Sequence, residues 1–255
     1  MRLNLKLVSI FFKYFKSLFT NHNLFETMKN NTETSLKPFI IVIPIFNGVD
    51  LMDIAAPREI FGWLATDESF NRDVKIVYVG SNEEFFTTNN GVKIAIEATF
   101  NDEFVQCPDL IWVPGGLPDN LAAIIADPNS PFTEYVKNAG SKADWVCSVC
   151  EGAVLLANTG LLNGHKITTH WAFTNCFENY PEVTVVDGHP RYVKSGNRIT
   201  GGGISSGLDE AFYLIELIAG TDSAIKVQQT MQYYPIPPVT SEIPSPKCCP
   251  IKGLD

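Results

Sequence analysis

The stretch Ser148-Val149-Cys150-Glu151-Gly152-Ala153 decides the fold. It joins an apolar run typical of a buried strand (145–149) directly to a predicted helix (151–159). A cysteine at this turn is the S-x-C-x-G counterpart of the G-x-S-x-G nucleophile elbow. The sharp turn exposes the side chain of its central residue, and Gly152 supplies the room that the turn needs. We therefore predict that Cys150 is a nucleophile rather than a buried structural cysteine. The helix N-terminus favours its thiolate, whereas the neighbouring Glu151 carboxylate opposes ionisation, so the pKa of the thiol is left open.

On both sides of this elbow, strand-length apolar runs alternate with longer amphipathic runs. The predicted strands are 39–46, 74–79, 92–98, 110–113, 145–149, 166–169, 183–186 and 198–200, and the predicted helices are 52–65, 132–139, 151–159, 206–219 and 222–233. Continuous apolar strands separated by helices indicate an α/β domain with a parallel sheet that is covered on both faces. In such sheets ligands bind at the carboxyl ends of the strands.

Charge is unevenly distributed over the 255 residues. The chain has 19 Lys and Arg against 28 Asp and Glu, a net charge of −9, of which residues 1–37 contribute +4 and the remainder −13. A body this acidic repels phosphate backbones, so nucleic-acid binding is excluded as its main function. No apolar run reaches the ~20 residues that span a bilayer.

The two ends of the chain differ in composition from the middle. Residues 1–37 read as a basic amphipathic extension outside the fold, 38–238 as the domain, and 239–255 as a Pro-rich extended tail. The extension is dispensable, a membrane-surface anchor or a targeting segment, and membrane contact is expected only through it. The six cysteines are interpreted as free thiols of a cytoplasmic protein, with Cys248-Cys249 incidental.

Polar and small residues follow the neighbouring predicted strands. Asp53 comes shortly after the first strand, where it is either a functional carboxylate or a helix N-cap. Gly115 and Gly116 close the strand 110–113 and are candidate backbone donors of an oxyanion-type site. Glu151 is a general acid or base, a group that orders water, or a first-turn helix residue that complements the dipole.

The other candidates give weaker signals. His170 follows a predicted strand and could approach the elbow, although a hydrogen-bonded core histidine is the more common case. Cys147 precedes Cys150 in a C-x-x-C, but it lies within the strand, which disfavours a redox pair. The histidines show no spacing of a zinc site, so no metal is expected.

Between residues 38 and 238 the chain resembles the ThiJ/PfpI superfamily, and within it the isonitrile hydratase branch. The segments that carry the likeness are Leu51–Pro57, Ile111–Gly116, Ser148–Gly152, Thr168–Ala172, Thr200–Ile204 and Val227–Pro238. The resemblance implies a flavodoxin-like three-layer sandwich, also called class I glutamine amidotransferase-like, with a mostly parallel sheet. It further implies a homodimer with the site near its interface, a small-molecule substrate and no cofactor or metal.

The activity that this resemblance implies is addition of water to an isonitrile, giving an N-substituted formamide. Cys150 would attack the terminal carbon to form a thioimidate, and Asp53 would handle protons. In the hydratases a threonine that takes part in the site follows the cysteine, and here that position is Glu151.

Two alternatives remain open at this stage. One is another chemistry of the superfamily, a glyoxalase, deglycase or peptidase, for which Glu151 and His170 would be suitable neighbours. The other is a non-catalytic cysteine redox sensor or ligand sensor, and sulfinic acid formation at Cys150 without turnover would favour it. The absence of a helix-turn-helix pair after Tyr234 disfavours a transcription regulator.

Overall fold

The computed structural model describes residues 36–254. The predicted amphipathic helix of the N-terminal extension falls within residues 1–35 and so lies outside the described residues. Helices within the described part include none that is long and apolar enough to cross a membrane.

A seven-stranded sheet forms the centre of the domain. Its order is β10 (Tyr192–Ser195), β11 (Arg198–Gly201), β7 (Trp145–Ser148), β6 (Leu110–Val113), β1 (Phe39–Pro44), β2 (Val74–Gly80) and β5 (Ala98–Thr99). All neighbours pair in parallel except β10 and β11. All residues of β1 and β6 are buried, as strands covered on both faces require.

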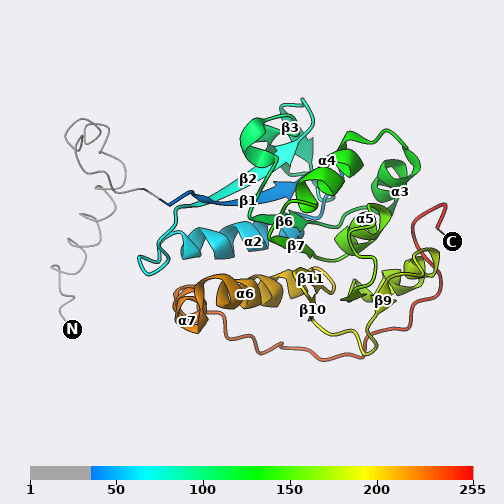
Figure 1. The fold of residues 1–255 in the computed structure, drawn as a ribbon. Helices are drawn as coiled ribbons and strands as arrows, with labels where there is room; N and C mark the ends of the chain where they lie inside the picture. Colours follow the sequence, from blue (N-terminus) through cyan, green and yellow to red (C-terminus); the bar gives the residue numbers. More distant parts are fainter. Residues whose placement is uncertain (1–35, 255) are drawn as a thin grey trace. The chain divides into compact units, whose positions relative to one another are not determined.

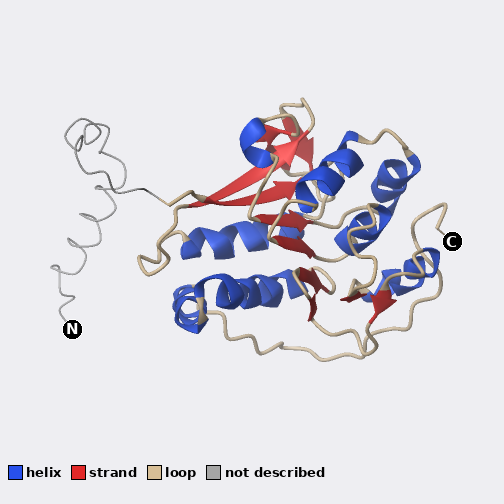
Figure 2. Ribbon diagram, in the orientation of Figure 1, coloured by secondary structure: helices blue, strands red, loops and turns tan. Residues whose placement is uncertain are grey.

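Helices cover both faces of this sheet (Figures 1 and 2). One layer holds α2 (Leu51–Leu64), α6 (Ser206–Ala219) and α7 (Thr221–Thr230), which contact one another. The opposite layer holds α3 (Pro118–Ala126), α4 (Pro131–Gly140) and α5 (Gly152–Asn158). The predicted three-layer α/β fold with a mostly parallel sheet is confirmed.

Three of the predicted strands differ from those of the structure. The run 92–98 is not one strand, because β4 (Lys93–Ala95) pairs with β3 (Phe85–Thr87) in a separate hairpin and only β5 joins the main sheet. The runs 166–169 and 183–186 supply β8 (Lys166–Ile167) and β9 (Thr184–Val185), a small separate sheet. Helix α3 and strand β10 were not predicted. Helix α3 begins at Pro118, whose missing N–H is tolerated in a first turn.

The C-terminal tail corrects the interpretation of the cysteines. Cys176, in the 3₁₀ helix η2 (Trp171–Asn179), forms a disulfide with Cys249, so Cys249 is not incidental. Ile251 is fully buried and anchors the same end of the chain. Cys107, Cys147, Cys150 and Cys248 are free thiols. The pairing joins residues 73 positions apart, a separation for which sequence spacing gives no rule.

We predict that Gly152→Ala destabilises the domain by ~3 kcal/mol, because a Cβ there would overlap the carbonyl oxygen of Val113. Gly62→Ala, within α2, is the control: its Cβ meets nothing within 4 Å. That change should raise stability by ~0.5–1 kcal/mol. Urea unfolding followed by circular dichroism measures both, and equal stability of the two variants would contradict the close approach at Gly152.

Candidate active site

Cys150 occupies a sharp turn between β7 and α5. Its φ is +58°, a left-handed conformation that is uncommon for a residue with a side chain. The surrounding backbone holds this conformation: Cys150 N–H donates to the carbonyl of Gly202 at 2.8 Å, and the Cys150 carbonyl accepts from Thr169 Oγ1 at 2.8 Å. The predicted elbow is therefore present, with its backbone bonded to two other segments.

Two glycines allow the neighbouring strand ends to approach the elbow. A Cβ on Gly115 would overlap a carboxyl oxygen of Glu151 and would lie 2.9 Å from the Cβ of Cys150. A Cβ on Gly152 would overlap the end of β6 at Val113. Glycine is thus required on both sides of the turn, because any side chain would separate the two strand ends.

Three acidic side chains meet at this point: Asp53 from α2, Cys150 from the elbow, and Glu151 next to it. One ligand atom from each lies within 4.8 Å of those of the other two. All three residues are buried, with exposed fractions of 0%, 1% and 7%. The sequence-predicted residues therefore converge in a site that is closed to bulk water.

Asp53 lies in the first turn of α2 and is not its N-cap. The cap is Asp50, whose carboxylate accepts from the N–H of Met52 at 3.1 Å. Asp53 Oδ2 accepts from the N–H of Gly115 at 2.9 Å, whereas Oδ1 has no partner among the described residues. Burial, with the nearby Glu151 carboxyl, raises the pKa of Asp53 well above its usual value and so favours its protonated form.

Glu151 is in hydrogen-bonding contact with the Cys150 thiol. Its side chain is hydrogen-bonded to Cys150, and the backbone N–H of Gly116 donates to it. Burial raises the pKa of Glu151 to about 7. Its side chain makes no cap hydrogen bond to α5. A carboxyl with this pKa holds or accepts a proton near neutral pH, which suits a general acid or base.

The structure bears on the pKa of the Cys150 thiol, which the sequence left open. Burial raises the pKa of Cys150 well above its usual value, and the negative charges of Asp53 and Glu151 raise it further. The backbone N–H of Ile204 opposes this shift by donating to the sulfur. Helix α5 spans only seven residues, and its N-terminus does not outweigh desolvation beside two carboxyls. Of the two opposing effects that the sequence indicates, the one that disfavours the thiolate is the larger.

Gly115 and Gly116 contact the acidic side chains, whereas His170 lies against Gly203. The N–H groups of Gly115 and Gly116 point to carboxyls, so in this structure they orient Asp53 and Glu151. His170 accepts from the N–H of Ala172 through Nδ1 at 3.2 Å and caps η2. Burial lowers the pKa of His170. Its ring lies against Gly203, where a Cβ would be 2.6 Å from Cδ2.

Glu210 of α6 is a buried carboxyl that sequence reasoning missed. It is fully buried, and neither carboxyl oxygen has a hydrogen-bond partner among the described residues. Burial, together with the charge of Asp53, raises the pKa of Glu210 well above its usual value. A glutamate within a regular amphipathic helix gives no sequence signal for this position.

Asp53, Cys150 and Glu151 form an acidic cluster. A thiol and two carboxyls can ligate a divalent cation, so the cluster is also a candidate metal site. The same three groups are also a nucleophile with two proton carriers.

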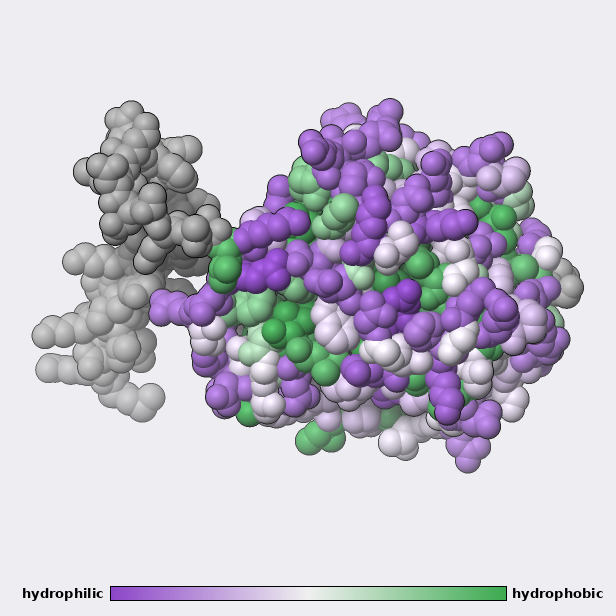
Figure 3. All heavy atoms as spheres, viewed as in Figure 1, coloured by the Kyte–Doolittle hydropathy of each residue, from purple (hydrophilic) through white to green (hydrophobic). Residues whose placement is uncertain are grey.

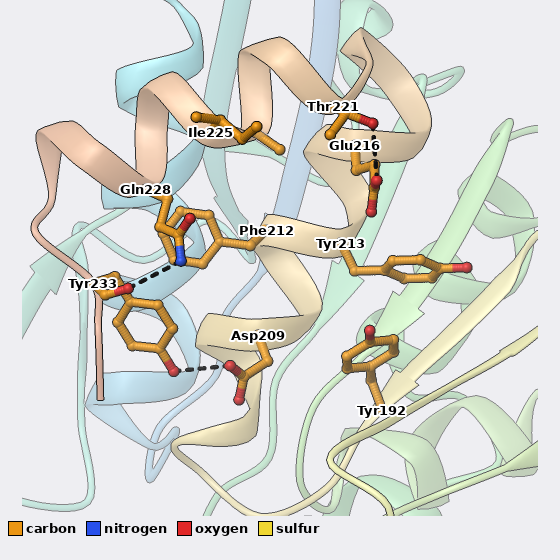
Figure 4. Close-up of a pocket in the computed structure, with 10 residues that line it drawn as sticks. Tyr192, Asp209, Phe212, Tyr213, Glu216, Thr221, Ile225, Gln228 and Tyr233 are labelled. Carbon is orange, nitrogen blue, oxygen red and sulfur yellow. Dashed lines mark hydrogen bonds between the residues drawn. The ribbon is translucent and has the colours of Figure 1, made fainter. Parts of the chain in front are cut away.

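A hollow of about 300 Å³ between α6, α7 and β10 contains none of these residues (Figure 4). Tyr233 bonds there to Asp209, and Tyr192 stacks on Tyr213.

Residues 40–217 match the DJ-1/PfpI family, and the chain belongs to this family. It is 32% identical over 202 residues to an isonitrile hydratase of Pseudomonas putida, covering 78% of this chain and 81% of the relative. It is 30% identical over 134 residues to an uncharacterized protease, YoaZ, of Bacillus subtilis, covering 52% and 61%. A crystal structure of a ThiJ/PfpI family protein from Pseudomonas syringae superposes with a TM-score of 0.71 and 25% identity, covering 85% and 86%.

We predict that Glu151→Gln accelerates alkylation of Cys150 by iodoacetamide at pH 8 at least ~threefold. The carboxylate raises the pKa of the thiol by its charge and its hydrogen bond, and glutamine removes the charge. Peptide mass spectrometry measures the rate, with the exposed Cys107 of the same molecule as the reference. An unchanged reaction at Cys150 would show that Glu151 does not control the thiol, and a slower one would contradict control by the charge of Glu151.

Proposed function

We propose that this protein is a cysteine-dependent hydratase that adds water to an isonitrile and releases an N-substituted formamide. The observation that carries the proposal is the left-handed elbow at Cys150 with two buried carboxyls, Asp53 and Glu151, within 4.8 Å. The 32% sequence identity to the P. putida isonitrile hydratase, which extends over 78% of this chain, also supports isonitrile hydration.

In the first step the thiol adds across the terminal carbon of the isonitrile. Glu151, as carboxylate, takes the proton of Cys150 while Sγ bonds to that carbon. Protonated Asp53 gives its proton to the same carbon. The product is a thioimidate, R–N=CH–S–Cys150, beside a protonated Glu151 and an ionised Asp53.

In the second step water resolves the thioimidate. Glu151 gives its proton to the imine nitrogen, and Asp53 takes a proton from water as the oxygen bonds to carbon. The adduct R–NH–CH(OH)–S–Cys150 then loses its hydroxyl proton to the departing sulfur, relayed by the carboxyls. A formamide leaves, and the thiol, protonated Asp53 and ionised Glu151 are restored.

Glu151 takes the position at which the hydratases carry a threonine. A hydroxyl can donate, and a carboxyl donates only when protonated. With its pKa raised to about 7, Glu151 exists in both forms near neutral pH. It therefore serves as the base of the first step and the acid of the second.

We expect formation of N-cyclohexylformamide from cyclohexyl isocyanide by the purified protein. Cys150→Ala and Asp53→Asn should each lower turnover at least ~100-fold, since one removes the nucleophile and the other a proton carrier. Dialysis against EDTA should leave turnover unchanged. A folded wild type that makes no formamide would overturn the proposal, and loss of turnover with EDTA would assign the acidic cluster to a metal.

The pH dependence tests Glu151 separately. Because the carboxylate is the active form in the first step, kcat/KM should rise with pH and level off above about 7, the pKa of Glu151. Glu151→Gln should remove this inflection and lower kcat/KM, even though it accelerates alkylation. An inflection near 7 that persists in this variant would assign the titration to another group.

A further inference from the structure

An apolar groove runs between α2 and α6. It has a volume of about 730 Å³, and Met52, Ala55, Leu208 and Met231 form its apolar wall. Figure 3 shows hydrophobic residues along the face where Figure 1 places α2 above α6. This volume lies within the range of small-molecule sites, ~300–1,000 Å³.

The groove adjoins the buried thiol. Ile204 lines it, and the backbone N–H of the same residue donates to the sulfur of Cys150. Asp50 also lines it, one helical turn before Asp53, and its N–H donates to the carbonyl of Gly115 at 3.0 Å. Two residues that line the groove thus contact the site by their backbones, which makes the groove a candidate for a group attached to the atom that Cys150 attacks.

The ionisable residues that line the groove are all acidic. Asp50 and Glu59 are its ionisable residues, and no Lys or Arg is among the described residues that line it. An anion in the groove would meet two carboxylates and no counter-charge, which opposes binding. An uncharged hydrocarbon would bury the side chains of Met52 and Leu208, which are otherwise partly exposed to water.

We propose that this groove binds the N-substituent of the substrate and selects neutral, apolar groups against groups that carry a carboxylate. Leu208 and Met52 determine affinity for the hydrocarbon, and Glu59 contributes to the rejection of anions. This inference rests on the proposed function for the reaction, while the groove itself is testable without turnover.

Alkylation of Cys150 provides that test, since a reagent whose N-substituent binds in the groove is held beside the thiol. Rates are measured by peptide mass spectrometry and divided by those of N-acetylcysteine with the same reagent. N-cyclohexyl iodoacetamide should react with Cys150 ~10-fold faster than iodoacetamide, which in turn should react ~10-fold faster than iodoacetate. Cys107, exposed and remote from the groove, should show no preference for the cyclohexyl reagent.

Two variants and a matched control locate the effect. Leu208→Asn should abolish most of the cyclohexyl preference, and Glu59→Lys should reduce the discrimination against iodoacetate at least ~threefold. Ile225→Asn, at an apolar position of α7 that is more exposed than Leu208 and lines the other hollow, should change neither ratio. Circular dichroism verifies that each variant is folded.

Equal normalised rates for the three reagents would overturn the proposal, including the case in which a second copy of the chain covers the groove. Rate differences that Leu208→Asn and Ile225→Asn change alike would also overturn it. If the selectivity follows the variants but no formamide forms, the groove stands and the proposed hydration falls. If formamide forms without this selectivity, the reverse holds.

Discussion

Close contact between two strand ends, Val113–Gly116 and Ser148–Gly152, is the constraint on which the site depends. Gly115 and Gly152 leave no side chain between them, so Glu151 and the Gly116 amide meet directly. The same contact directs the N–H of Gly115 at Asp53, which arrives from α2. The elbow at Cys150 keeps its left-handed backbone because Gly202 and Thr169 bond to it from two further segments. Four separate parts of the chain thus fix one thiol.

Burial without a counter-charge gives this site its resting chemistry. Asp53, Cys150 and Glu151 are all desolvated, and burial is the largest cause of each raised pKa. A raised pKa favours the neutral thiol, whose reaction depends on transfer of its proton to a neighbour, whereas an ionised cysteine would react unaided. In the proposed reaction such a site would couple bond formation to proton movement between groups that are already close together and buried from water.

Sequence patterns predicted the fold better than the electrostatics. Apolar runs such as 110–113 and 206–219 coincide with β6 and α6, because burial on one or both faces leaves a periodic record. The elbow was visible because a glycine follows the cysteine at fixed spacing. The pKa of Cys150 could not be predicted from sequence. It depends on burial and on how closely Asp53, 97 positions away in sequence, approaches the thiol. The disulfide and Glu210 escaped for the same reason: neither long-range pairing nor burial of a single helical glutamate has a local signature.

The link between Cys176 and Cys249 turns the last third of the domain into a covalent ring. Strands β10 and β11 and helices α6 and α7 all lie between these two residues in sequence. Closing a ring of this size restricts the unfolded chain and is worth ~4 kcal/mol in the chain-entropy description. Because Ile204 and Gly202, whose backbones are hydrogen-bonded to Cys150, belong to the ring, the restriction on the unfolded chain includes the segment beside the thiol. Reduction of this disulfide, whose sulfur atoms lie outside the acidic cluster, would remove that restriction without changing the groups of the site.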